Sequence, residues 1–342
     1  MIKVGIIGYG FSAKTFHLPF ILSTNQYQLV AISTSKLNEA HNDYPQQTIY
    51  ASADELIEQA EIDLVIITAP NAVHFSLAKA CLLKSLHVVI EKPMTTTVQE
   101  GETLIALAKI QKVMLSVYHN RRWDGDFLTV KNLLAKQTLG NVHIFESHFD
   151  RFRPLVRDRW RENPGAGAGI WFDLGSHLID QALCLFGLPT SVTARCLSLR
   201  ENSATVDYFH VQLHYEKLEV ILHSSPHMAA SNKRFQLDGS KGCYIKYGLD
   251  PQEEQLKAGL SPLHKDFGVE LNSEFAQGHL YYATSDEALD TQAGNYSIYY
   301  QQLADAIKGK HHCPVSGEEA LQVIKLLVLA QESSDKGQTL TL

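Results

Sequence analysis

Several features that define specialised protein classes are scarce or missing in this chain. Its 342 residues include five cysteines, scattered along the sequence and odd in number. A disulfide framework uses paired cysteines, so we expect reduced thiols in a cytoplasmic protein. No apolar run approaches the length that spans a bilayer, and no signal peptide precedes the first apolar run. We therefore expect no membrane partner and no secretion.

Positive charge is also in deficit, since 30 lysines and arginines face 37 acidic residues, giving a net charge of −7. This balance argues against a general nucleic-acid surface, although a local basic pocket for an anionic cofactor remains compatible with it. Metal motifs are missing as well: there is no HExxH and no CxxC, and the side chains of the adjacent His311, His312 and Cys313 diverge. We predict no nucleic-acid partner and no metal.

What is present is typical of a folded α/β protein with 45% hydrophobic and 20% charged residues. The length favours two domains, which we place at residues 1–122 and 123–342. Apolar, β-branched runs alternate with helical patterns in the first, which predicts a Rossmann doubly wound parallel sheet. Alternating polarity after residue 191 predicts a C-terminal α+β domain with a large, mainly antiparallel open sheet.

The patterns also place individual elements. In the first domain strands are expected at 3–7, 27–32, 64–68, 87–90 and 113–118, and helices at 53–60 and 97–110. In the second, a helix is expected at 127–136, a strand at 142–149 and a last helix at 318–333. Residues 250–295 are polar and weakly patterned, and we interpret them as an excursion from the antiparallel sheet.

The first strand leads directly into a glycine-rich turn. Gly8, Gly10 and Ala13 have the GxGxxG/A spacing of a dinucleotide-binding loop. The first glycine makes the tight turn, the second lets the backbone approach a pyrophosphate, and the third small residue lets the helix pack on the strand. The intervening Tyr9, Phe11 and Ser12 belong to the same predicted cofactor site.

The end of the second strand bears on the choice of cofactor. Ser33, Thr34, Ser35 and Lys36 occupy the place where an NAD enzyme usually has an acid for the ribose hydroxyls. A carboxylate would repel a 2′-phosphate, whereas hydroxyls and a lysine hold one, so we predict NADP. The alternative is an ordinary polar turn that also accepts NAD.

Two further segments carry candidate catalytic groups. EKP contains Lys92, and GIWFDLGSH contains Asp173 and His177, which share a face if the segment is α-helical. A carboxylate can orient an imidazole that acts as a general base, and a lysine can stabilise an alkoxide. Taken singly, each has a simpler explanation: a surface cation, a helix-start acid and a core histidine.

The order of the segments GYGFSA, TAPNAVH, EKPM, YHNRRWD and WFDLGSH resembles the glucose-fructose oxidoreductase and inositol dehydrogenase family, Gfo/Idh/MocA, over nearly the whole chain. Within it, SVYHNRRWDGDF, VDYFH and IKYG look closest to the NADP-dependent scyllo-inositol dehydrogenases. The resemblance implies that Lys92, Asp173 and His177 form the catalytic set. It further implies a cofactor lining of Thr68, Pro70, Asn71, His74, Glu91, Lys92, Pro93, Asn120, Trp160 and Arg161.

Basic residues near the expected crevice are candidates for substrate binding. They are Arg121, Arg122, Arg151, Arg153, Arg157 and Arg159, some of which are expected to be ordinary surface charges or ion pairs. We place Tyr118, Arg121 and Arg151 with Lys92, Asp173 and His177 in the substrate site. His210 and His214 share one strand face, which either contacts substrate or forms a sheet-to-sheet dimer interface.

The sequence thus predicts an oxidoreductase that transfers hydride between NADP, or NAD, and a secondary alcohol or ketone of a cyclic polyol or sugar. His177 is the expected base, Lys92 stabilises the alkoxide and Asp173 orients the histidine. The alternatives are a reductase of another ketone or imine, and a non-catalytic sugar-sensing regulator on the same fold. A homodimer or homotetramer is expected.

Overall fold

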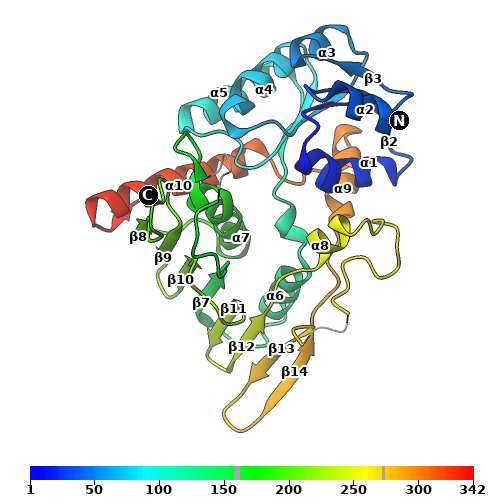
Figure 1. The fold of residues 1–342 in the computed structure, drawn as a ribbon. Helices are drawn as coiled ribbons and strands as arrows, with labels where there is room; N and C mark the ends of the chain where they lie inside the picture. The colour runs from blue at the N-terminus through cyan, green and yellow to red at the C-terminus, as the bar shows by residue number, and fades with distance from the viewer. Residues whose placement is uncertain (158–161, 272–273) are drawn as a thin grey trace. The chain divides into compact units, whose positions relative to one another are not determined.

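The computed structural model describes residues 1–157, 162–271 and 274–342, which form two compact units (Figure 1). The first unit consists of residues 1–120, 252–267 and 295–324. The second unit consists of residues 121–251, 268–294 and 325–342. The boundary predicted after residue 122 lies next to the first crossing at residue 120. The returns of the chain to the first unit were not predicted.

The first unit is built on a six-stranded sheet in which all neighbouring strands run parallel. The spatial order is β3-β2-β1-β4-β5-β6. The strands are β1 (Ile2–Ile7), β2 (Tyr27–Ser33), β3 (Thr48–Tyr50), β4 (Leu64–Ile67), β5 (His87–Ile90) and β6 (Leu115–Val117). This is the Rossmann order, and the direction of winding reverses between β1 and β4, where such sheets bind ligands. The predicted doubly wound fold is confirmed.

Helices connect these strands, and sequence signals set their ends. The Ser52 side chain accepts from the Glu55 N–H while Glu55 reaches back to the Ser52 N–H, so the capping box starts α3. The unit contains α1 (Leu18–Leu22), α2 (Leu37–Asp43), α3 (Ala53–Gln59), α4 (His74–Leu83), α5 (Val98–Gln111), α8 (Gln252–Lys257) and α9 (Ser297–Ile307). Helices α4 and α5 pack side by side (Figure 1).

The late segments complete the core of the first unit with aromatic side chains. Tyr300 of α9 stacks on Phe20 at 5.6 Å between ring centroids. The neighbouring Tyr299 meets the ring of Tyr118 at 4.9 Å. Because α9 supplies these buried rings, the parallel sheet is packed by residues from both ends of the chain.

The second unit is built on a nine-stranded sheet ordered β14-β13-β12-β11-β7-β10-β9-β8-β15. Only the pair of β7 and β10 is parallel among the described strand pairs of this sheet. The strands are β7 (Val142–His148), β8 (Ser191–Leu197), β9 (Tyr208–His214), β10 (Glu219–Ser224), β11 (Lys233–Gly239), β12 (Gly242–Tyr247), β13 (Gln277–Tyr281), β14 (Asp286–Asp290) and β15 (Leu340–Thr341). The predicted, mainly antiparallel sheet is confirmed, and Figure 1 shows it ending in the β13–β14 hairpin.

One face of this sheet is the core of the second unit. Phe145, Phe209 and Leu222 are fully buried. The ring of Phe145 packs on Phe186, and that of Phe209 packs on Trp171. The covering helices are α6 (Gly125–Ala135), α7 (Ser176–Phe186) and the second half of α10 (Gly317–Lys336). The opposite face carries polar, half-buried side chains, following the predicted alternation.

The segment 250–295 is more regular than its composition indicates. It contains α8, which belongs to the first unit, and the strands β13 and β14, which extend the sheet of the second unit. Among the described residues, each helix falls short of the length or the hydrophobicity required to span a bilayer.

Candidate active site

The glycine-rich turn joins the carboxyl ends of three strands of the first unit. Gly8 has φ +98°, and a Cβ there would lie 2.9 Å from Oγ1 of Thr68 and 3.1 Å from its carbonyl carbon. The Gly8 N–H donates to the Ser33 carbonyl at 2.9 Å, and the Thr68 hydroxyl donates to the Gly8 carbonyl at 2.9 Å. Only glycine fits this turn, as the motif predicts.

The second glycine leaves room for a ligand. A Cβ at Gly10 would meet nothing within 4 Å, and the following helical turn, η1 (Ala13–His17), starts on the fully buried Ala13. These residues fit a pyrophosphate, which needs close backbone approach and free N–H groups at a helix start. Phe11 is exposed, whereas the Tyr9 hydroxyl donates to Asp43 at 2.6 Å, so Tyr9 offers such a ligand its backbone.

The turn after β2 divides into a buried and an exposed half. Ser33 and Thr34 are buried, and the Thr34 hydroxyl accepts from the Lys36 N–H at 3.0 Å. Ser35 and Lys36 are exposed, and the Lys36 ammonium lies 3.3 Å from Glu39. The side chains that can reach a ligand here are therefore Ser35 and Lys36, while Ser33 and Thr34 shape the turn.

The loops after β4 and β5 are joined by His74. Its Nδ1 and Nε2 each lie 2.9 Å from a backbone carbonyl oxygen, of Pro93 and Ala69 respectively. Burial lowers the pKa of His74, which favours the neutral ring. The Lys92–Pro93 peptide bond is cis. His74 thus positions the EKP segment. The 3₁₀ turn η2 (Asn71–Val73) lies just before His74, with Pro70 as its N-cap residue.

A charged network that the sequence did not reveal surrounds Glu91. Its Oε1 accepts a hydrogen bond from the Ser12 hydroxyl and lies 3.0 Å from Nε2 of His17. The other His17 nitrogen lies 2.6 Å from the Tyr300 hydroxyl. Burial raises the pKa of Glu91, but His17 and Ser12 outweigh burial and hold the pKa at about 2. Glu91 therefore ties the glycine-rich segment to the EKP segment as a carboxylate.

Three predicted site residues lie around the end of this sheet. Lys92 directly follows Glu91, and its backbone N–H donates to the Glu91 carboxylate at 3.1 Å. Asn120 is 7% exposed, at the point where the chain leaves the first unit. Tyr118 is buried, with its ring 4.5 Å from that of His17. Tyr118 thus belongs to the aromatic packing that supports the Glu91 network.

The second unit carries Asp173 and His177 on one continuous helical segment. Trp171–Gly175 is a π-helical turn, η5, and Ser176–Phe186 is α7. A Cβ at Gly175 would lie 2.3 Å from the Trp171 ring, whose Nε1–H donates to the Leu327 carbonyl at 3.0 Å. A π-helical turn is wider than an α-helix. Asp173 and His177 therefore do not have the α-helical spacing that the sequence analysis assumed.

Buried polar contacts fix α7 in the second unit. Arg122 donates to both carboxylate oxygens of Asp180, with its closest contact at 2.7 Å. Gln181 donates to the Arg121 carbonyl and accepts from the buried Arg234 at 2.7 Å. The Arg122–Asp180 ion pair and the hydrogen bonds of the Gln181 amide anchor α7, the helix that contains His177. Arg122 therefore has a structural role here.

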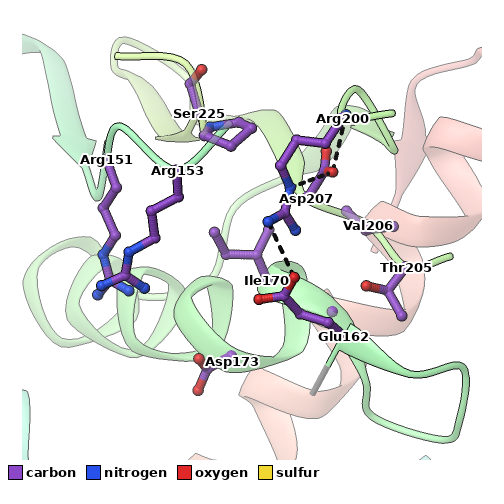
Figure 2. Close-up of a pocket in the computed structure, with 12 residues that line it drawn as sticks. Arg151, Arg153, Glu162, Ile170, Asp173, Arg200, Thr205, Val206, Asp207 and Ser225 are labelled. Carbon is purple, nitrogen blue, oxygen red and sulfur yellow. Dashed lines mark hydrogen bonds and ion pairs between the residues drawn. The ribbon is translucent and has the colours of Figure 1, made fainter. Parts of the chain in front are cut away.

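A pocket of the second unit opens beside Asp173 (Figure 2). Arg151 and Arg153 extend in the same direction into it. Arg200 also lines the pocket, but its guanidinium lies 2.9 Å from Asp207 and 3.1 Å from Glu162. The remaining lining residues are Gly169, Ile170, Thr205, Val206, Ser225 and Pro226. The pocket can therefore present two arginines and a carboxylate to a polar ligand.

The other predicted basic residues have separate surroundings. Arg121 lies 3.2 Å from the Asp124 carboxylate and stacks over Phe149, and Arg157 is exposed. Arg159, Trp160 and Arg161 lie outside the described residues. The predicted cofactor residues with described positions, Lys92 among them, lie in the first unit. Asp173, His177 and Arg151 lie in the second unit.

Comparison with known proteins agrees with this geometry. Residues 2–119 match the family model of the oxidoreductase NAD-binding Rossmann fold, and residues 131–342 match that of the oxidoreductase C-terminal alpha/beta domain. The uncharacterized oxidoreductase YdgJ of Escherichia coli is 47% identical over 100% of this chain and 99% of its own.

A Bacillus subtilis enzyme sequence and a solved structure from the same organism are similar over the same span. The scyllo-inositol 2-dehydrogenase (NADP(+)) IolW is 42% identical over 100% of this chain and 96% of its own. The solved structure of yvaA superposes with a TM-score of 0.95 and 41% identity, covering 100% of this chain and 98% of that one. A Rossmann unit with a glycine-rich turn, followed by an open-sheet unit, matches both halves of one family: the chain is an oxidoreductase of the Gfo/Idh/MocA family.

Proposed function

We propose that this oxidoreductase uses NADP(H) and interconverts a secondary alcohol and a ketone of a cyclic polyol or sugar. The observation that carries the cofactor choice is the turn after β2, where exposed Ser35 and Lys36 occupy the position at which an acid selects NAD. The substrate class is supported by the full-length similarity to IolW, whose name specifies scyllo-inositol and NADP.

In the proposed reaction a bound nicotinamide supplies the hydride acceptor or donor. His177 removes the proton of the substrate hydroxyl when the alcohol is oxidised and returns it when the ketone is reduced. Lys92 stabilises the negative charge that develops on the same oxygen. Asp173 orients the imidazole, and its carboxylate favours the protonated ring.

The pocket of the second unit supports a polar substrate. Arg151 and Arg153 bring several N–H donors to one side of it, and Asp173 brings acceptor oxygens. A ring that carries hydroxyls at many positions offers both donors and acceptors to such a lining. An apolar ketone can accept or donate few hydrogen bonds in such a lining, so it would gain less binding free energy there.

The test is a panel of inositols, aldoses, simple ketones and imines, each assayed with NADP and with NAD. We expect scyllo-inositol or a close stereoisomer to be oxidised, with kcat/KM at least about tenfold higher for NADP, equivalent to roughly 1.4 kcal/mol. Lys36→Ala should lower kcat/KM with NADP and leave that with NAD nearly unchanged. Equal efficiency with both cofactors, or equal losses in the variant, would contradict the cofactor proposal.

Turnover of simple ketones or imines without turnover of any polyol would contradict the substrate proposal. Arg153→Ala provides a matched check of the pocket, because the substitution removes a lining guanidinium and leaves the β2 turn intact. It should raise KM for the polyol while the Kd for NADP stays unchanged. An unchanged KM would place polyol recognition outside this pocket.

A further inference from the structure

The polar face of the nine-stranded sheet carries a cluster that the proposed reaction does not use. Glu146 and His148 point to this face of β7, and Asp150 follows two residues later. In the parallel pairing of β7 with β10, His223 lies directly beside His148. The cluster of His148, Asp150 and His223 therefore comes from two neighbouring strands that are distant in sequence, which explains why no sequence motif announces it.

The side chains are spaced as the ligands of one metal ion would be. One ligand atom from each of the three residues lies within 4.8 Å of the others. His148 Nδ1 is 3.2 Å from an Asp150 oxygen, and His223 Nδ1 is 2.8 Å from the other. Adjacent ligand atoms around tetrahedral zinc are about 3.3–3.6 Å apart, given bonds of about 2.0–2.2 Å. Small side-chain rotations would bring all three onto one ion.

The surroundings orient the candidate ligands. Nε2 of His148 lies 3.0 Å from Glu146, which is paired with Lys233 at 2.5 Å. A carboxylate that accepts from the outer nitrogen of a histidine leaves the inner nitrogen as a metal ligand. The Ser225 N–H donates to Asp150 Oδ1 at 2.8 Å, so the backbone holds that carboxylate in place.

His223 gives an independent indication. Its Nδ1 is buried and, within the described part of the chain, has no partner in hydrogen-bonding geometry, although Asp150 is only 2.8 Å away. The Asp150 oxygen therefore lies outside the direction in which an N–H on Nδ1 of His223 would point. A cation between the two atoms would use both the nitrogen and the oxygen, and the burial of both would then be compensated.

We propose that His148, Asp150 and His223 bind one divalent transition-metal ion, with zinc the best match to two imidazoles and a carboxylate. Magnesium and calcium prefer oxygen ligands throughout, so they fit this set poorly. Three protein ligands leave a fourth position for water. The ion would join the ends of β7 and β10 next to Arg151 and Ser225, which line the pocket.

The experiment uses the full-length, untagged protein, stripped with a chelator and then titrated with Co²⁺ and Zn²⁺. We expect one equivalent of Co²⁺ per chain with the visible absorption of a tetrahedral or five-coordinate site. Cobalt–thiolate charge-transfer bands should be absent, which distinguishes this site from cobalt bound to cysteine. Zn²⁺ should displace the cobalt and raise the Tm of the protein.

His223→Gln and His148→Gln should each lower the affinity for Zn²⁺ by about 100-fold or more, while Glu146→Gln should lower it by about 10- to 100-fold. The matched control is His214→Gln, because His214 also pairs with a carboxylate, Glu219, on the same sheet face but belongs to no three-ligand cluster among the described residues. This control should bind Zn²⁺ as the wild type does.

Circular dichroism of the stripped proteins shows whether each variant is folded. If His148→Gln is unfolded, His223→Gln and Glu146→Gln still test the site. Less than half an equivalent of bound metal at micromolar free Zn²⁺ would overturn the proposal. So would equal affinity in the wild type and in folded His223→Gln, and the cluster would then be an ion-pair network alone.

Discussion

Gly8 and Gly10 stand two residues apart and have different physical reasons to be glycine. Gly8 has a positive φ and no space for a Cβ, so the folded backbone itself requires glycine there. Gly10 has open space around the position of a Cβ, so the fold tolerates a methyl group. The requirement at Gly10 arises only when a ligand approaches the backbone.

We predict that Gly8→Ala lowers the free energy of unfolding by roughly 2 kcal/mol, as expected for a strained left-handed residue. Gly10→Ala should keep the wild-type Tm and weaken NADP binding by at least about tenfold. Urea unfolding and fluorescence titration with NADPH measure the two effects. A Gly10→Ala protein that binds NADPH normally would place the pyrophosphate away from this turn.

The catalytic assignment gives the second prediction. His177→Ala should reduce kcat by roughly 100-fold or more, the usual contribution of a positioned general base. The Kd for NADP should change little, because the predicted cofactor residues with described positions lie in the first unit. Steady-state assays and NADPH titration separate the two quantities.

Lys92→Ala should reduce kcat similarly, and the double variant should lose less than the product of the two single losses. Asp173→Asn should have a smaller effect than His177→Ala if the carboxylate only orients the ring. A His177→Ala enzyme with wild-type turnover of its polyol would assign the base to another group.

The role of a single residue could be predicted from the sequence where only one residue type meets the physical requirement of that position. Gly8 was predictable because its turn follows directly from local spacing. The contacts of Glu91 were not, because Glu91 pairs with His17, which in turn contacts Tyr300, and no short motif links these three residues. The division of the β2 turn into buried Thr34 and exposed Lys36 likewise depends on three-dimensional packing.

At the scale of elements, the Glu91 network connects the end of β5 with the helical segment after β1. The pKa of Glu91 is held at about 2, below its ordinary value of 4.5, so the carboxylate stabilises the fold at pH values above about 4.5. That stabilisation is lost as the pH falls toward 2, because protonation then favours the unfolded chain. The side chain is 14% exposed, so solvent screens it little.

We predict that Glu91→Gln lowers the free energy of unfolding at pH 7 by on the order of 3 kcal/mol. The difference from the wild type should shrink between pH 4.5 and pH 2. Urea unfolding at several pH values measures it. Glu39→Gln is the control, since the exposed Glu39 also pairs with lysines and should give no measurable change. A constant difference across this pH range would contradict the role of the charge.

Element prediction from the sequence succeeded where burial imposes a strong pattern. Residues 87–90 form a strand with the predicted bounds. Val88, Val89 and Ile90 are apolar and buried on both faces of β5, and His87 at its start is half-buried. Residues 250–295 gave no such pattern, because β14 is an edge strand whose side chains are mostly exposed. The π-helical turn η5 was not predicted, and in it the Trp171 ring packs so close to Gly175 that a Cβ there would lie 2.3 Å from the ring.

At the scale of the whole molecule, the polar face of the second sheet bears on assembly. Ile221 and Ile144 interrupt this face, and Ile144 is 37% exposed. Apolar side chains on a sheet face are stabilised when a second copy covers them, and a twofold axis would bring the same face of each copy together. We therefore retain the prediction of a homodimer or homotetramer.

Light scattering at micromolar concentration should give a mass at least twice the 38.2 kDa of one chain. Ile221→Asp should lower that mass toward the monomer, whereas Leu263→Asp, an exposed position on a loop of the first unit, should not. A wild-type mass equal to that of one chain would exclude the oligomer. An oligomer unaffected by Ile221→Asp would place the interface elsewhere.

The interleaving of the two units has a consequence for biosynthesis. A ribosome releases the chain from its N-terminus at roughly 5–20 residues per second. The strands of the parallel sheet have all emerged once residue 120 is made. Helix α9, with Tyr299 and Tyr300, belongs to the same unit but is made much later, shortly before α10. Until then Phe20 lacks the ring of Tyr300 and Tyr118 lacks the ring of Tyr299, so chaperones can still reach them. The nascent protein is therefore expected to mature in one late step, with both units closing almost together.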